Sequence, residues 1–148
     1  MTRPFRSLTV LVLAGVLAGI SAAGCSPIGP SSSPEVRPTA ALTVETFTGT
    51  LPLKGAAFYS FSVVERGTTY LSLINLKEGG VDSGVKVSIG LGTPRNTTCA
   101  TSNILSVLAN GELSLTGVTD RGVHCAVIFD TGNLTKDATF SLNITHPK

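Results

Sequence analysis

The chain has 148 residues, of which 14% are charged, and it contains three cysteines and no tryptophan. This length allows one domain. Lysine and arginine number 11 against nine acidic residues. Two of the basic residues, Arg3 and Arg6, lie in an N-terminal segment that we expect to be removed, which leaves the remaining chain without net charge. No basic field remains to attract a polyanion, so the composition argues against a nucleic-acid partner.

Residues 1–24 have the pattern of an export signal. Arg3 and Arg6 precede an uncharged apolar run at 8–20, which is followed by the small residues at 21–24. This order is typical of a secretory signal peptide, and we expect it to form a signal helix. A permanent transmembrane anchor is the alternative, but the run is shorter than the roughly 20 residues that a spanning helix needs.

The four residues Ala22-Ala23-Gly24-Cys25 resemble the lipobox of bacterial lipoproteins. In that family the cysteine sulfur is diacylated, and cleavage just before it leaves the cysteine as the new N-terminus. The family favours Leu where Ala22 stands, and Ser26 replaces the Asp that in enteric bacteria retains lipoproteins at the inner membrane. The resemblance implies lipidation, such as a palmitate chain, at Cys25. It also implies a location in the cell envelope, on the periplasmic or cell-surface face of a membrane.

Residues 25–41 are expected to form the lipidated cysteine and a disordered linker. The stretch 26–41 contains four prolines and four serines and has no apolar periodicity. Such composition favours an extended chain, which at 3.1 Å per residue would reach roughly 50 Å. The folded domain is therefore expected to cover residues 42–148.

Within that domain, apolar residues alternate with polar ones in several short segments. Period two places one set inward and the other outward, as half-buried strands require. In this interpretation Val123, Cys125, Val127 and Phe129 point inward, whereas His124 points outward. Glycine-containing turn signals separate the segments. The pattern predicts an all-β fold, an antiparallel sandwich of about eight strands. The expected strands are 44–50, 58–64, 69–76, 85–91, 104–108, 112–116, 123–129 and 140–144.

The order of these segments resembles the pre-peptidase C-terminal domain, a jelly-roll-like β-sandwich of secreted bacterial proteins. The likeness lies in residues 47–51 with 57–63, in residues 65–73, and in residues 117–129 followed by 140–144. The resemblance implies a non-catalytic domain that usually accompanies an enzyme. The family usually has an Asp where Ala57 stands, so a role of that Asp in calcium binding does not transfer.

With Cys25 assigned to lipid, Cys99 and Cys125 remain. An exported domain with two thiols is expected to pair them in a disulfide. This bridge would pin the polar stretch 94–103, interpreted as a long loop, onto the core. A metal-binding or nucleophilic pair is the weaker alternative, because the chain has no CxxC motif and no matching histidine spacing.

No catalytic constellation is evident, and we expect no enzymatic activity. Asp120, His124 and a nearby serine could be drawn as a hydrolase triad, but no serine lies in a GxSxG motif. His146, close to the C-terminus, is expected to be solvated.

Two weaker ligand sites are considered. Asp130, Asn133 and Asp137 place oxygen ligands at short spacing, which can bind calcium, although Asp and Asn also form ordinary turns. No other cofactor is expected. Tyr70 is a candidate aromatic platform for a sugar, although a strand-end tyrosine with a solvated hydroxyl is the plainer interpretation.

The sequence thus favours a membrane-anchored, non-catalytic lipoprotein of the envelope that binds a protein partner or assists assembly. A module that binds a glycan or peptidoglycan is the alternative, and a hydrolase is a less favoured one.

Overall fold

The computed structural model describes residues 40–148, which form nine strands and no helix. Nothing within these residues is a helix long and apolar enough to cross a membrane. The expected signal helix and almost all of the expected linker lie outside the described residues. The strands are β1 (Leu42–Leu51), β2 (Ala56–Val63), β3 (Gly67–Glu78), β4 (Val81–Asp82), β5 (Val87–Arg95), β6 (Thr98–Val107), β7 (Leu115–Thr119), β8 (Gly122–Phe129) and β9 (Ala138–Pro147).

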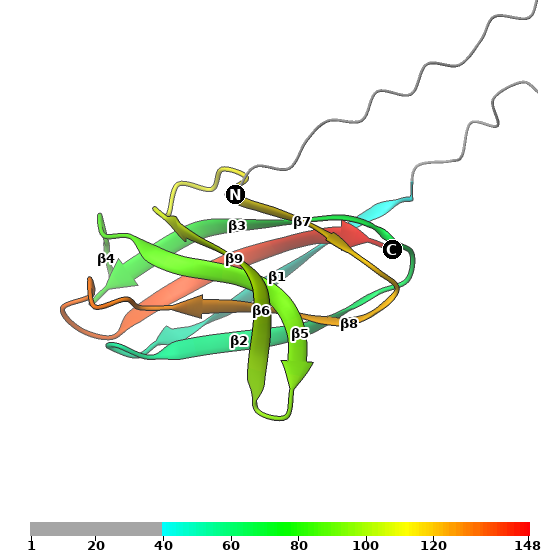
Figure 1. Cartoon of the computed structure of the whole chain (residues 1–148). Helices are drawn as coiled ribbons and strands as arrows, with labels where there is room; N and C mark the ends of the chain where they lie inside the picture. Colours follow the sequence, from blue (N-terminus) through cyan, green and yellow to red (C-terminus); the bar gives the residue numbers. More distant parts are fainter. Residues whose placement is uncertain (1–39) are drawn as a thin grey trace, which may run out of the picture. The chain divides into compact units, whose positions relative to one another are not determined.

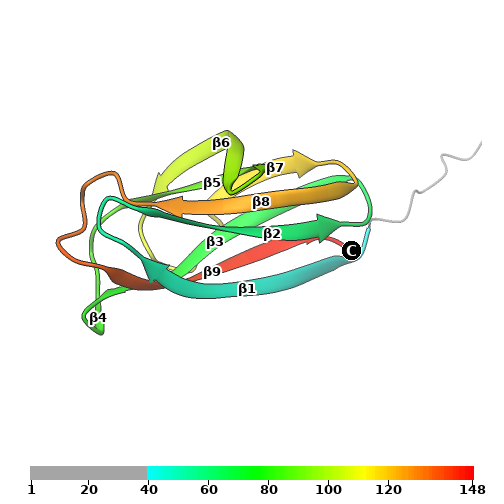
Figure 2. The ribbon, with the colours of Figure 1, turned by 90° about the horizontal axis from the view of Figure 1, so that it is seen from below.

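The strands form two antiparallel sheets that pack face to face (Figures 1 and 2). Sheet A has five strands in the order β1-β9-β3-β4, with β7 also paired to β3, and sheet B has four strands in the order β2-β8-β5-β6. Apart from the short β4, the first four strands β1, β2, β3 and β5 pair with β9, β8, β7 and β6. The chain is therefore a double ribbon rolled into a jelly roll, which confirms the expected sandwich.

The core lies between the sheets and follows the expected alternation on most strands. On β5 and β9 the residues expected to point inward are buried in it, including Ile89, Leu91, Leu142 and Ile144. Tyr59 on β2 also packs against this core, as its alternation with Phe61 indicates. Removing these side chains from water is the main favourable term in folding.

The expected phase of β8 is wrong. Ala126 and Ile128 join the core between the sheets, and His124 lies on the same face, opposite Phe61 of β2. Cys125 and Val127 point to the other face, where they are still buried. Both alternating sets of this strand are largely apolar, so periodicity does not distinguish its two phases. Burial of the outer face comes from the β5–β6 hairpin, which bends across β8 in Figure 1.

The polar stretch 94–103 is not a long loop but the tip of this hairpin. Arg95 pairs with Thr98, so that only Asn96 and Thr97 form the turn. Asn96 has a positive φ of 53°, a conformation that asparagine tolerates better than most residues. The Thr98 hydroxyl donates to the Arg95 carbonyl oxygen at 2.9 Å and closes the turn. Threonine-rich sequence therefore forms a strand here, in keeping with the β-propensity of threonine.

Candidate functional site

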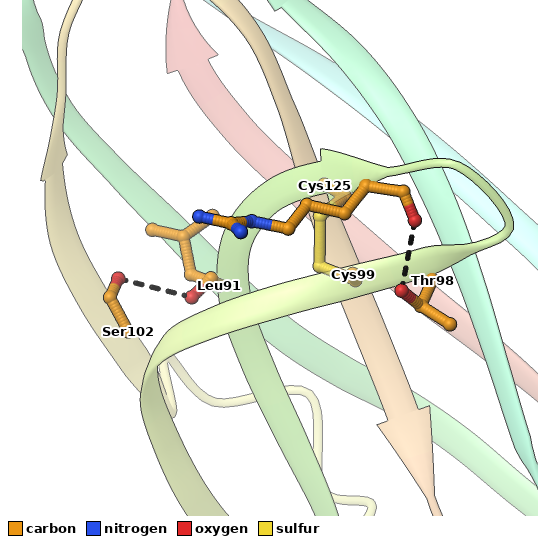
Figure 3. Close-up of a disulfide and its surroundings, with 6 residues drawn as sticks. Leu91, Thr98, Cys99, Ser102 and Cys125 are labelled. Atoms are coloured by element: carbon orange, nitrogen blue, oxygen red, sulfur yellow. Dashed lines mark hydrogen bonds between the residues drawn. A yellow bond between two sulfur atoms is a disulfide. The ribbon is translucent and has the colours of Figure 1, made fainter.

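Cys99 and Cys125 form the expected disulfide, which links two strands that are not neighbours (Figure 3). Cys99 lies on β6 and Cys125 on β8, and β5 runs between these strands. In a flat sheet the backbones of two such strands would be about 9.5 Å apart, twice the spacing of neighbouring strands. The two Cα atoms are only 5.9 Å apart. The hairpin must therefore fold over β8 for the bond to form.

Glycine on β5 permits this fold. Gly92 pairs with Cys125 on one side and with Thr101, two residues from Cys99, on the other. A Cβ atom on Gly92 would overlap the carbonyl oxygen of Ala100 and would lie 2.6 Å from the carbonyl carbon. The register also shifts between Leu91 and Gly92, a bulge of the kind that bends a strand. The absence of a side chain at Gly92 and the bulge together allow the tip of the hairpin to pack on β8.

The three residues considered for calcium lie in the loop between β8 and β9, where Asp130 is buried. One carboxylate oxygen of Asp130 accepts the Lys54 amide at 2.8 Å. The other accepts the amides of residues 132, 133 and 134 at 2.9, 2.9 and 3.2 Å. Amide hydrogens thus point at both oxygens, which is the arrangement that folds a loop around a carboxylate.

The other members of this group have similar structural contacts. Asp137 accepts the Leu53 amide at 2.8 Å, and the Asn133 side chain donates to the Lys86 carbonyl at 2.9 Å. Residues 40–148 contain no cluster of three or more histidine, cysteine, aspartate or glutamate residues that could hold a metal ion. The contacts show that Asp130 and Asp137 join the β8–β9 loop to the turn between β1 and β2.

Sequence reasoning missed Glu78, which holds the same loop from β3. One of its oxygens accepts the Thr135 amide at 2.8 Å and hydroxyl at 2.9 Å, and the Lys136 amide at 3.2 Å. Its second oxygen accepts the Ser83 hydroxyl at 2.7 Å. The Ser83 hydroxyl, followed by the bonds from residues 135 and 136, lowers the Glu78 pKa from 4.5 to about 2. No local sequence motif indicates the contact with the loop, because Thr135 and Lys136 are more than 50 residues from Glu78.

Asp120 and His124 do not form the acid–base pair of a triad. The His124 ring contacts the backbone carbonyl of Asp120, with 2.8 Å between Nε2 and that oxygen. The Asp120 carboxylate instead pairs with Arg66 at 2.8 Å, and both side chains are highly exposed. A general base needs an acid that orients its ring, and the carboxylate of Asp120 does not have that role.

His146 is buried, at 2% exposure, and the expectation of a solvated side chain is wrong. Its Nε2 lies 3.0 Å from the Glu45 carboxylate, its Nδ1 lies 3.0 Å from the Pro147 carbonyl oxygen, and its ring packs against Phe61. The signal was present in the sequence. His146 continues the inward series of Phe140, Leu142 and Ile144 at period two.

Tyr70 lies on the outer face of sheet A, between Thr116 of β7 and Thr145 of β9, and is partly exposed. The side chains around it carry no charge. We call this surface the neutral face. Its members are Leu42, Val44, Thr46, Thr48 and Thr50 of β1, Thr68, Tyr70 and Ser72 of β3, Thr116 and Val118 of β7, and Thr139, Ser141, Asn143 and Thr145 of β9.

Charged side chains lie at both ends of this face, where they pair with each other: Lys77 with Asp82 at 3.7 Å near β4, and Arg66 with Asp120 at 2.8 Å beyond Thr68 and Val118. The neutral face therefore presents hydroxyl, amide and methyl groups around one tyrosine. Cys25, which the sequence predicts to carry the lipid, lies outside the described residues.

A search against protein-family models finds none that matches this chain. A search of curated proteins likewise finds no significant match.

Proposed function

We propose that the chain is a lipoprotein of a bacterial cell envelope, anchored to a membrane through Cys25, whose sandwich is a non-catalytic module for protein binding or assembly. The signal pattern of residues 1–24 and the lipobox-like residues up to Cys25 support the anchor. The proline- and serine-rich residues after it support a spacer that lets the domain reach a partner.

The observation that carries the binding role is the neutral face. The central part of protein interfaces is depleted of charged residues and enriched in tyrosine, while a solvated surface normally intersperses both signs of charge. Val44 and Val118 are 58% and 67% exposed on this face, and Tyr70 lies between their strands. A partner protein could cover this surface without burying an unpaired charged side chain.

Charge substitutions on the two outer faces test this role in the full lipidated chain. Val44→Glu with Thr116→Glu charges the neutral face, and Val123→Glu with Ser62→Glu is the control on sheet B, where Val123 is similarly exposed at 54%. The measurement is in-cell crosslinking followed by quantitative mass spectrometry of envelope proteins captured with the chain. We expect the first pair to lose its principal partner and the control to keep it. Equal capture by both variants would reject the neutral face as the docking surface.

A glycan- or peptidoglycan-binding module is the second candidate, favoured by the position of Tyr70 in register between two threonines, Thr116 of β7 and Thr145 of β9. An aromatic side chain offers an apolar body with a polar edge, which suits a sugar ring. In this case Tyr70→Ala would abolish retention of the protein on purified peptidoglycan, and Tyr70→Phe would preserve most of it. Equal retention by wild type and Tyr70→Ala would remove this candidate.

The resemblance to the pre-peptidase C-terminal domain supports the same non-catalytic proposal. Ala57, which stands at the position of that family's Asp, pairs with Ile128 and packs against the core. The proposal therefore relies on the surface of the sandwich and assigns no calcium to this position.

A further inference from the structure

The free edge of β6 is the feature from which we infer a second binding surface. β6 pairs only with β5, and residues 104–108 make no backbone hydrogen bond on their other side within residues 40–148. Alternate residues of such an edge direct N–H and C=O groups into open space. Other edges are partly blocked: the Tyr59 hydroxyl donates to the Thr48 carbonyl on β1, and the Asn103 side chain donates to the Thr116 carbonyl on β7.

A hollow of about 300 Å³ lies along this edge, between β6 and the segment 108–114. Three leucines on its walls are exposed: Leu105 by 41%, Leu108 by 43% and Leu113 by 66%. The segment is fixed in place, because the amides of Gly111 and Ser114 donate to carbonyls of β3 at 3.0 Å. The edge thus combines unpaired backbone groups with three exposed leucines, set among polar side chains such as Ser106 and Asn110.

We propose that this groove binds an extended segment of a partner protein, which adds to β6 as a further strand. Unpaired N–H and C=O groups select an extended backbone, and the leucines select apolar side chains at every second position. Lys86 and Glu112 at the rim of the hollow have opposite charges, so they favour a segment without net charge. This inference goes beyond the proposed function, since it names a different surface and the form of the partner.

A second copy of the chain fits this edge less well. Pairing two β6 edges would bring the wall formed by residues 108–114 of each copy against the sheet of the other. The straight part of the edge is also short, because the register shifts where Asn103 and Thr101 meet β5. Five paired residues bury far less than the roughly 1,200 Å² of a stable dimer interface, whereas the docking of a short extended segment does not require an interface of that size. A single extended segment needs only the space of one strand.

Site-specific photocrosslinking in the full lipidated chain tests the groove. Benzoylphenylalanine replaces Ser106, an exposed residue at the groove, or Ser62, an exposed control on β2 at the opposite edge of sheet B. Each is combined in turn with Leu113→Arg, which charges the groove wall, or with Val81→Arg, a control side chain that is 71% exposed on β4. Retention of the disulfide and of the β-sheet circular dichroism shows that each variant is folded.

We expect position 106 to crosslink to one stretch of another protein with apolar residues at alternate positions. Leu113→Arg should reduce this product at least tenfold, Val81→Arg should leave it unchanged, and position 62 should not form it. Crosslinks from position 106 to β6 of a second copy would overturn the proposal, as would no product at 106 or equal products at both positions. None of these results bears on the neutral face, whose charge substitutions are tested separately.

Discussion

At the scale of single residues, three carboxylates fix the β8–β9 loop. Burial raises the pKa of Asp130, but hydrogen bonds from the amides of Lys54 and of residues 132–134 outweigh it, so that the pKa lies below its ordinary value. Glu78 and Asp137 hold the same loop from β3 and from the β1–β2 turn. At Asp130 and Glu78 the hydrogen bonds favour the ionised carboxylate, so their contribution to stability is largest while these two groups are charged.

Glu78 gives a testable pH dependence. Its pKa falls from 4.5 to about 2 in the folded chain. Because the folded pKa is lower, the stabilisation is fully present above pH 4.5 and is lost as the pH falls toward 2. We expect Glu78→Gln to unfold at a lower temperature than wild type at pH 7, with the difference shrinking as the pH falls to about 2.

Calorimetry across this pH range measures the effect. Glu65→Gln, at an exposed carboxylate in the β2–β3 turn, is the control. A difference between wild type and Glu78→Gln that stays constant with pH would contradict the assigned role.

Residue roles were the least predictable part of this chain. Asp130, Asn133 and Asp137 lie in one loop, but their spacing does not reveal that backbone amides donate hydrogen bonds to the carboxylates of Asp130 and Asp137. The role of Glu78 is harder still to predict, because its partner Thr135 is far away in the sequence and comes close only in the folded chain. His146 was predictable, since it continues the inward period of β9.

At the scale of elements, the bent β5–β6 hairpin depends on a glycine. A Cβ atom at position 92 would meet the backbone of Ala100, which cannot move without displacing β6. We expect Gly92→Ala to destabilise the fold by about 3 kcal/mol, at the upper end of overpacking costs. Urea unfolding measures this change. Gly84→Ala is the control, because a Cβ atom there meets nothing within 4 Å. Similar unfolding midpoints for the two variants would show that the hairpin tolerates a side chain at position 92.

The disulfide holds the same hairpin on β8. It closes a loop with a sequence separation of 26, for which chain entropy gives about 3–4 kcal/mol. We expect the double variant Cys99→Ala and Cys125→Ala to lose about that much free energy of unfolding in urea and to keep its β-sheet circular dichroism. Hydrogen exchange should rise chiefly in residues 92–101. An unchanged midpoint, or uniform exchange throughout the domain, would show that the bridge does not hold this hairpin.

The sequence predicts elements better when only one face of a strand is apolar. On β5 the inward series Val87, Ile89 and Leu91 alternates with small or polar residues, and its phase is correct. On β8 both series are largely apolar because Cys125 and Val127 are buried under the hairpin. The phase could therefore not be read from that strand alone. It required the pairing of β8 with β2, which is a property of the tertiary fold.

At the scale of the whole molecule, the jelly roll follows from many short strands separated by turns, which the sequence does display. The order β1-β9-β3 with β2-β8-β5-β6 requires long-range pairing, in which the two ends of the domain meet. Leu42 pairs with Pro147, and the Lys148 amide donates to the Ala41 carbonyl at 2.7 Å. Residues 41 and 42 therefore lie beside residues 147 and 148, at the end of the last strand.

We expect membrane attachment to depend on the lipid at Cys25 alone. Two or more acyl chains on one residue give stable attachment, and neither the neutral face nor the groove supplies an equivalent. We expect Cys25→Ser to move the protein from the detergent phase to the aqueous phase in Triton X-114 partitioning of producing cells. Cys99→Ala with Cys125→Ala should leave it in the detergent phase, which separates loss of the lipid from loss of a cysteine elsewhere. If Cys25→Ser still partitioned with detergent, the uncleaved apolar run 8–20 would be holding the chain, and the lipoprotein assignment would be wrong.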